Sequence, residues 1–133
     1  MLARWLGLGL LLSLGGCAVQ TSALREHVPS DLRHAVELEA TPFFAQSEYQ
    51  CGPAALATAL TAAGLHADPA ELAQQVFLPA RTGTLQVEMI AGARRQGAVA
   101  TRVPATLEAL LREVQAGHPV SYTAGRDLHI QAH

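Results

Sequence analysis

Residues 50–64 of this 133-residue chain have the sequence QCGPAALATALTAAG, and this stretch decides where the first core helix begins. Pro53 suits the first turn of a helix, because the N–H that proline lacks would have no partner there in any case. Alanines and leucines follow at spacings that give a closely packing apolar face, and Gly64 is typical of a helix end. The sequence therefore predicts a helix that opens beside Cys51.

A cysteine at the start of a helix is a candidate nucleophile. The thiolate is the reactive form of cysteine, and the unpaired N–H groups and positive dipole end of a helix N-terminus favour it over the neutral thiol. The chain has only two cysteines, and the other, Cys17, is expected to be modified. An unpaired cysteine in an exported protein indicates a reactive thiol, with a buried structural thiol as the alternative.

The first sixteen residues predict export. One positive charge lies within residues 1–4, and residues 5–14 form an apolar run of about ten residues, half of the ~20 that a membrane-spanning helix needs. The sequence Leu14-Gly15-Gly16-Cys17 resembles the lipobox of bacterial lipoproteins, in which the peptide is cut before the cysteine and that cysteine is acylated. An ordinary signal peptide with an incidental cysteine is the alternative.

The lipobox resemblance implies a membrane anchor at Cys17. Two or more acyl chains on one residue anchor a protein stably, whereas one chain holds it only marginally. We therefore expect a lipoprotein of the cell envelope, at the periplasmic face, with the outer membrane favoured because Ala18 stands where aspartate is linked to inner-membrane retention.

The rest of the chain accommodates one small domain and not two. We expect a signal peptide over residues 1–16, a spacer over residues 17–35 and the domain over residues 36–133. The net charge is −2 and the basic residues do not cluster beyond Arg94-Arg95, so nucleic acid is not an expected partner. The chain has no glycine-rich phosphate loop followed by Lys and Ser or Thr, and hence no ATP-binding motif.

Local patterns predict an α+β domain, with helices first and strands in the C-terminal part. Three more helices are expected, each with its own start signal: the first at Asp68 with Glu71 three residues on, the second at Thr84 and the third at Thr106. The apolar stripes of the last two helices are expected to be core. Period-two alternation or β-forming composition predicts strands over residues 36–40, 98–103, 120–123 and 128–132.

Residues 42–57, PFFAQSEYQCGPAALA, resemble the active-site segment of the papain-like cysteine peptidases that process double-glycine leader peptides, the bacteriocin-processing endopeptidases. The similarity is closest to a branch of exported lipoproteins with this domain. It extends over roughly residues 38–120, including the segments FLPARTGTLQ (residues 77–86) and AGHPV (residues 116–120). It implies a papain-like fold in which helices precede an antiparallel sheet, here incomplete.

The resemblance also implies roles for individual residues. Cys51 matches the nucleophile that attacks a peptide carbonyl to form a thioester. Gln46 matches the glutamine whose side-chain amide stabilises the oxyanion together with the Cys51 N–H, and Gln50 is a second candidate because the family often places this glutamine one residue further upstream than Gln46 stands here. His129, ten positions past Pro119, is the expected base. The aromatic residue and valines that follow the family histidine are absent, and so is its orienting Asp or Asn.

The remaining histidines are not expected to take part in chemistry. His118 precedes a proline at the start of a predicted strand and is interpreted as structural or solvent-facing. His129 and His133, four residues apart, would not share a face of a strand, and no third ligand is apparent, so neither a metal nor another cofactor is expected.

The sequence thus predicts a lipid-anchored cysteine peptidase that hydrolyses peptide bonds through a Cys51 thioester, with leader-peptide processing as the default substrate guess. Its expected partners are a peptide or protein substrate and the membrane. Two alternatives stay open. One is an inactive peptidase-like module that binds a peptide without cutting it, and the other is a product of a shortened gene whose tail after Val120 is not family sequence.

Overall fold

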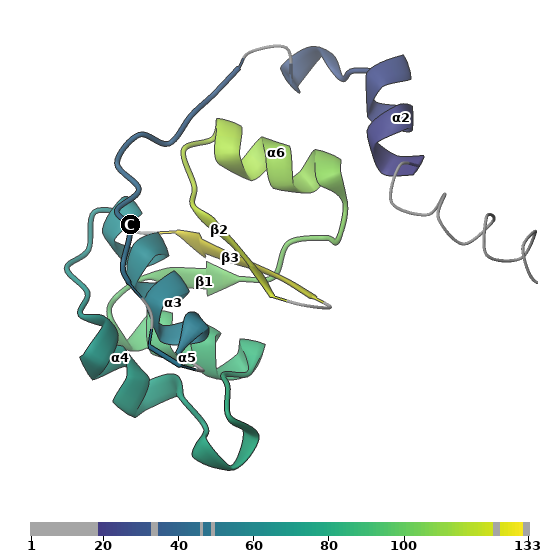
Figure 1. The fold of residues 1–133 in the computed structure, drawn as a ribbon. Coiled ribbons are helices and arrows are strands. Elements are labelled where there is room, and N and C mark those ends of the chain that lie inside the picture. The colour runs from purple at the N-terminus through teal and green to yellow at the C-terminus, as the bar shows by residue number, and fades with distance from the viewer. Residues whose placement is uncertain (1–18, 33–34, 46, 49, 124–125, 132–133) are drawn as a thin grey trace, which may run out of the picture.

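The computed structural model describes residues 19–32, 35–45, 47–48, 50–123 and 126–131, with side chains up to residue 121. Helices and a small sheet are both present, so the α+β prediction is confirmed at that level (Figure 1). The sheet is antiparallel and has the order β1-β3-β2, with β1 Val99–Thr101, β2 Val120–Thr123 and β3 Arg126–Gln131. The strands expected near residues 98, 120 and 128 are therefore found, the first of them shorter than predicted.

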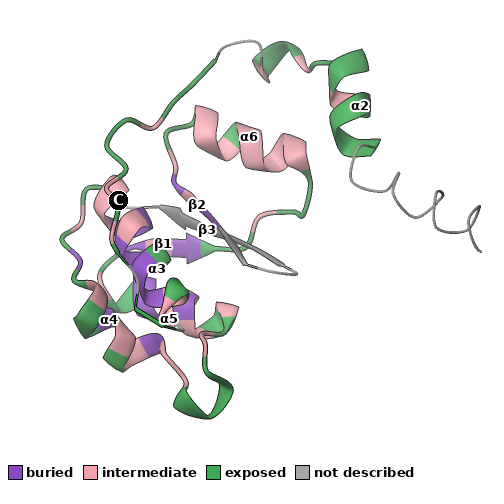
Figure 2. Ribbon diagram, viewed as in Figure 1, coloured by how far each residue is buried: buried purple, intermediate pink, exposed green. Residues whose placement is uncertain are grey.

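Three helices lie on one side of this sheet: α3 Cys51–Ala62, α4 Pro69–Val76 and α5 Gln86–Arg95 (Figure 1). Helix α3 contacts β2 and β3, and α5 contacts β1 and β3. The buried residues lie mainly on α3, α4, α5 and β1 (Figure 2). This cluster consists of Leu56, Ala57, Ala59, Leu60, Ala67, Leu72, Val76, Met89, Ala93, Ala98 and Ala100.

Most helix ends lie where the local signals predict them. Helix α3 begins at Cys51 itself, and the chain leaves the helix through Gly64, whose φ of 85° is readily adopted only by glycine. At the start of α4, Asp68 Oδ1 accepts hydrogen bonds from the N–H groups of Ala70 and Glu71, at 2.7 and 3.0 Å. Asp68 is therefore the N-cap, as predicted.

The cap expected at Thr84 is wrong. The residue in the N-cap position of α5 is Leu85, and no side chain caps this helix. Thr84 instead lies against Gly52 in the first turn of α3. A tertiary contact has replaced the local hydrogen bond that the sequence suggested.

Helix α6 Leu107–Gln115 lies on the other side of the sheet from α3, α4 and α5 (Figure 1). It is capped as predicted, because Thr106 Oγ1 accepts a hydrogen bond from Ala109 N at 3.2 Å. Its apolar stripe was expected to be core, but no residue of α6 is fully buried (Figure 2). Helix α6 packs against β2, a 3₁₀ turn over Ser30–Leu32 and helix α2 Val19–Glu26. Its leucines are half-buried.

Helix α2 and the 3₁₀ turn fall within the predicted spacer, for which no helix is among the expected elements. Polar contacts join them to α6. Gln20 Oε1 accepts a hydrogen bond from Leu107 N at 2.9 Å, and Arg112 Nε donates to Asp31 Oδ2 at 2.8 Å. We call residues 19–32 the N-terminal arm.

The strand predicted over residues 36–40 is wrong. These residues have no regular secondary structure, and only Leu38 is half-buried while its neighbours are exposed. A strand needs a partner for its N–H and C=O groups, and no described strand pairs with this segment. Five alternating residues were too few to establish that a sheet neighbour exists.

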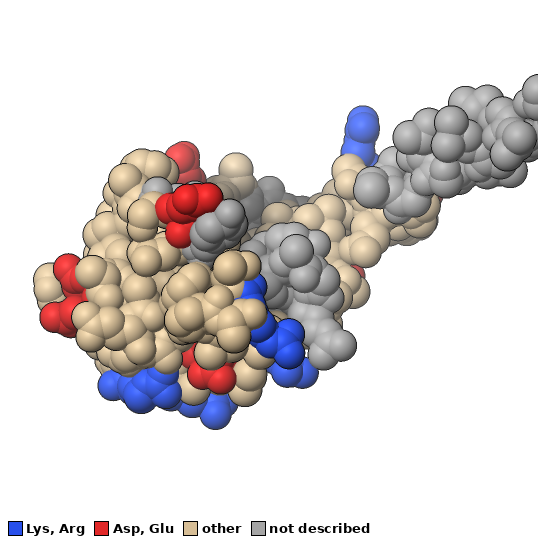
Figure 3. All heavy atoms as spheres, turned by 60° about the horizontal axis from the view of Figure 1, so that its bottom comes forward, with Lys and Arg blue, Asp and Glu red and all other residues tan. Residues whose placement is uncertain are grey.

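The surface carries charges of both signs. On the face drawn in Figure 3, arginine side chains lie along one edge with acidic side chains between and beyond them. Among the described helices, none combines the length and apolar character needed to cross a membrane.

Candidate functional site

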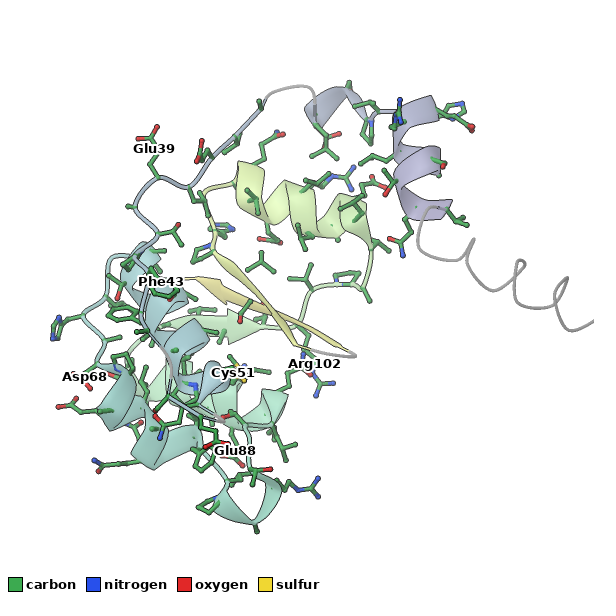
Figure 4. The ribbon with its side chains drawn as sticks, viewed as in Figure 1. Glu39, Phe43, Cys51, Asp68, Glu88 and Arg102 are labelled. Atoms are coloured by element: carbon green, nitrogen blue, oxygen red, sulfur yellow. The ribbon has the colours of Figure 1, made fainter. Side chains whose placement is uncertain are left out.

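Cys51 is the first residue of α3 and is exposed to solvent. Figure 4 shows it at the start of α3, on the side of the molecule away from α2. Helix N-termini leave their first N–H groups without partners inside the helix, and no side chain caps α3. The thiol is therefore accessible and stands beside backbone donors that can stabilise a negative charge.

The turn before Cys51 is held by Ser47 and Gln50. Gln50 N donates to Ser47 O at 3.1 Å, and Ser47 Oγ donates to Gln50 Oε1 at 2.9 Å. This second bond orients the Gln50 side-chain amide, and no other described residue hydrogen-bonds that amide. Its nitrogen is thus available as a donor on the residue that precedes Cys51, which keeps Gln50 as a candidate for the oxyanion role.

The other expected oxyanion donor, Gln46, lies outside the described residues, as does the expected lipidation site Cys17. Ser47 is not among the site residues expected from the sequence. The signal that could have found it is the Ser-x-x-Gln spacing directly before the cysteine, where a short side chain can reach a residue three positions on.

His129 lies in β3, the central strand, where its backbone pairs with Val120 on one side and Thr101 on the other. The neighbouring position, Ile130, pairs with Ala100, which is buried in the core cluster beneath the helices. Residues directly opposite in a sheet share a face and successive residues alternate. This register puts position 129 on the other face of the sheet from Ala100.

The described histidine side chains are those of His27, His66 and His118, and none of them hydrogen-bonds the Cys51 thiol. His118 Nδ1 lies 2.8 Å from Glu113 Oε2, and the backbone N–H of His118 donates to the backbone carbonyl of Glu113 at 2.9 Å. These contacts join His118 to the end of α6, in line with its expected structural role. Within the part of the chain that the structure describes, no group of three or more His, Cys, Asp or Glu side chains could hold a metal ion.

Comparisons with protein-family models, with curated proteins and with solved structures gave no match to this chain. The function of the site is therefore argued from its own residues. The structure shows an accessible thiol, an oriented Gln50 and unpaired N–H groups at the start of α3. It does not place a base beside them among the described side chains.

Proposed function

We propose that this protein is a lipid-anchored cysteine peptidase of papain-like fold that hydrolyses peptide bonds through a thioester on Cys51. The observation that carries the proposal is the exposure of the Cys51 thiol at the first residue of α3. A nucleophile must be open to its substrate, and a helix N-terminus supplies backbone donors for the oxyanion that forms on attack. The resemblance of residues 42–57 to the bacteriocin-processing peptidases supplies the peptide substrate class.

The proposed roles follow from that resemblance. The Cys51 thiolate attacks the carbonyl carbon, and the oxyanion is stabilised by the Cys51 N–H together with the Gln46 or Gln50 amide. His129 is the proposed base, which takes the thiol proton and returns it to the leaving amine. Water then hydrolyses the thioester and restores the thiol. The protein would be exported and anchored through Cys17 to the cell envelope.

The test is hydrolysis of a peptide library by the protein, with Cys51→Ala measured beside it. Activity that disappears in Cys51→Ala, and falls in His129→Ala but not in His66→Ala, supports the full assignment. His66 is a matched control because it is an exposed histidine in a loop. Hydrolysis that persists in Cys51→Ala would refute the thioester mechanism.

Reactivity of the thiol gives a second, independent measurement. We expect Cys51 to react with iodoacetamide at pH 6 faster than a short unstructured peptide of the same local sequence. The comparison removes the effect of neighbouring residues in the chain and leaves the effect of the helix start. Equal rates would show that the fold does not activate this thiol.

A peptide-binding module without catalysis is the second candidate. Phe43, which is 88% exposed, offers an apolar contact for a bound segment. This candidate predicts saturable peptide binding by the wild-type protein and Cys51→Ala alike, with no cleavage by either.

A further inference from the structure

The first turn of α3 fits closely onto the residue that precedes α5. A Cβ atom built on Gly52 would lie 2.5 Å from Thr84 Oγ1, 2.6 Å from Thr84 Cβ and 3.3 Å from Thr84 Cγ2. Real Cβ atoms do not come this close to other heavy atoms, so the Thr84 side chain occupies the space that any larger residue at position 52 would need. Gly52 directly follows Cys51, and this contact therefore bears on the turn that holds the thiol.

A hydrogen bond of the Thr84 hydroxyl does not explain this contact. Its Oγ1 atom is covered and has no hydrogen-bond partner among the described residues. An unpaired buried hydroxyl costs about 1–3 kcal/mol. Its position is thus set by the packing of the side chain onto Gly52 and not by hydrogen bonding, and each such group in a native protein calls for an explanation.

We infer that Thr84 is a positioning residue for Cys51, an inference that rests on the proposed peptidase function. By filling the hollow over Gly52, Thr84 fixes the first turn of α3 against the start of α5. That turn carries both the thiol and the backbone N–H that the oxyanion would meet. Small displacements of reacting groups, of about 1 Å, can reduce catalysis about 100-fold.

The contact also explains two sequence features together. The residue after Cys51 is glycine because a side chain there would collide with Thr84. Thr84 does not cap α5, although it stands next to the helix, because its side chain is turned to Gly52. The shape of the Thr84 side chain, and not its hydroxyl, is what holds the turn.

The test compares five variants of the full chain by the pH dependence of Cys51 alkylation, with thermal unfolding measured alongside. Thr84→Gly removes all three close atoms and should slow alkylation roughly tenfold or more and change its pH profile. Thr84→Ser keeps the two closest atoms, and Thr84→Val keeps the shape without the hydroxyl. Both should retain the wild-type pH profile. If Thr84 only stabilised the fold, Thr84→Gly would lower the unfolding temperature without changing the pH profile of the folded protein.

The last two variants are Gly52→Ala alone and Gly52→Ala combined with Thr84→Gly. Gly52→Ala combined with Thr84→Gly puts a Cβ where the Thr84 side chain was, and it should recover stability and alkylation relative to the two single changes. Such non-additivity between contacting residues is measured by a double-mutant cycle. If Gly52→Ala alone does not fold, a double variant that folds and alkylates faster than Thr84→Gly shows the rescue directly.

Each outcome tests either the positioning role of Thr84 or the proposed peptidase activity. A Thr84→Val protein that folds but alkylates as slowly as Thr84→Gly would overturn the inference, because the hydroxyl would then be the active group. Unchanged alkylation in folded Thr84→Gly would overturn it as well. If wild-type protein hydrolyses peptides, Thr84→Gly should lower kcat with KM unchanged. If it hydrolyses none while alkylation still depends on Thr84, the positioning role stands and the peptidase proposal fails.

Discussion

Gly92→Ala is a substitution for which helix propensity and packing predict opposite signs. Gly92 is a buried residue inside α5, and glycine within a helix is about 1 kcal/mol less favourable than alanine. Propensity alone therefore predicts that alanine stabilises the protein. The structure predicts the reverse, because a Cβ on Gly92 would lie 2.5 Å from Val76 Cγ1 and 3.1 Å from Leu56 Cδ2.

At Gly92 the packing cost should exceed the gain in helix propensity, so that alanine lowers the stability of the protein. Val76 and Leu56 are fully buried, and the branched side chain of Val76 has few rotamers through which to withdraw. Overpacking of this kind costs about 1–3 kcal/mol, and a contact as short as this one belongs in the upper part of that range. Subtracting the propensity gain leaves a net loss of about 1–2 kcal/mol. For a domain of this size each kcal/mol lowers Tm by about 4–8 °C.

Thermal unfolding followed by circular dichroism tests the sign. The matched control makes the same change in a Val76→Ala background, where the colliding Cγ1 is absent. There Gly92→Ala should raise Tm, because the propensity gain remains and the new methyl fills part of the cavity. A higher Tm for Gly92→Ala in the wild-type background would refute the close packing of α5 against α4.

Three further predictions concern the core, a cap and the N-terminal arm. Leu60→Ala, at a fully buried position, should cost about 2–5 kcal/mol in urea unfolding, while Leu85→Ala, at a position 39% exposed, should cost far less. Asp68→Ala should cost about 1 kcal/mol and Asp68→Asn almost nothing, because Asn also caps helices. The hydrogen bond from Arg112 holds the pKa of Asp31 below its ordinary value of 3.8. Docking of the arm should therefore be intact above pH 3.8 and weaken as the pH falls through the lowered pKa, which the α6 amide signals would report by NMR.

The controls for these predictions differ in kind. Asp31→Asn should remove the acid-dependent shift of the α6 amides, since no carboxylate remains to titrate; a shift that survives this change would assign it to another group. Equal losses for the two leucine variants would contradict the burial that distinguishes them. A stable Asp68→Ala would show that the cap contributes little to α4.

Local signals predicted the helices well because the interactions that start and end a helix lie within a few residues of each other. Asp68 and Thr106 bond N–H groups two or three positions on, and Gly64 adopts its positive φ without help from the rest of the fold. The start of α3 at Cys51 is of the same kind. The part of the candidate site that depends on this helix could therefore be predicted from the sequence.

The errors arose where a residue's role is set by distant partners. Residues 36–40 alternate as a strand does, but they have no described neighbouring strand. Thr84 has the chemistry and position of a cap. Its side chain instead packs against Gly52, which lies more than thirty positions earlier in the chain. The half-buried stripe of α6 belongs here too, because an amphipathic pattern shows which face is apolar but not how completely the rest of the chain covers it.

The same distinction separates the two halves of the proposed mechanism. The nucleophile depends on where a helix begins, which neighbouring residues determine. The base depends on the register of β3, because side chains alternate along a strand and a shift by one residue moves every side chain to the opposite face. In the structure, the backbone of His129 pairs with Val120 of β2 and with Thr101 of β1. The His129→Ala variant therefore tests the sheet as well as the chemistry. Hydrolysis that is lost in a folded His129→Ala protein would assign the base to β3, whereas peptide binding without cleavage by the wild-type protein would assign the second candidate function.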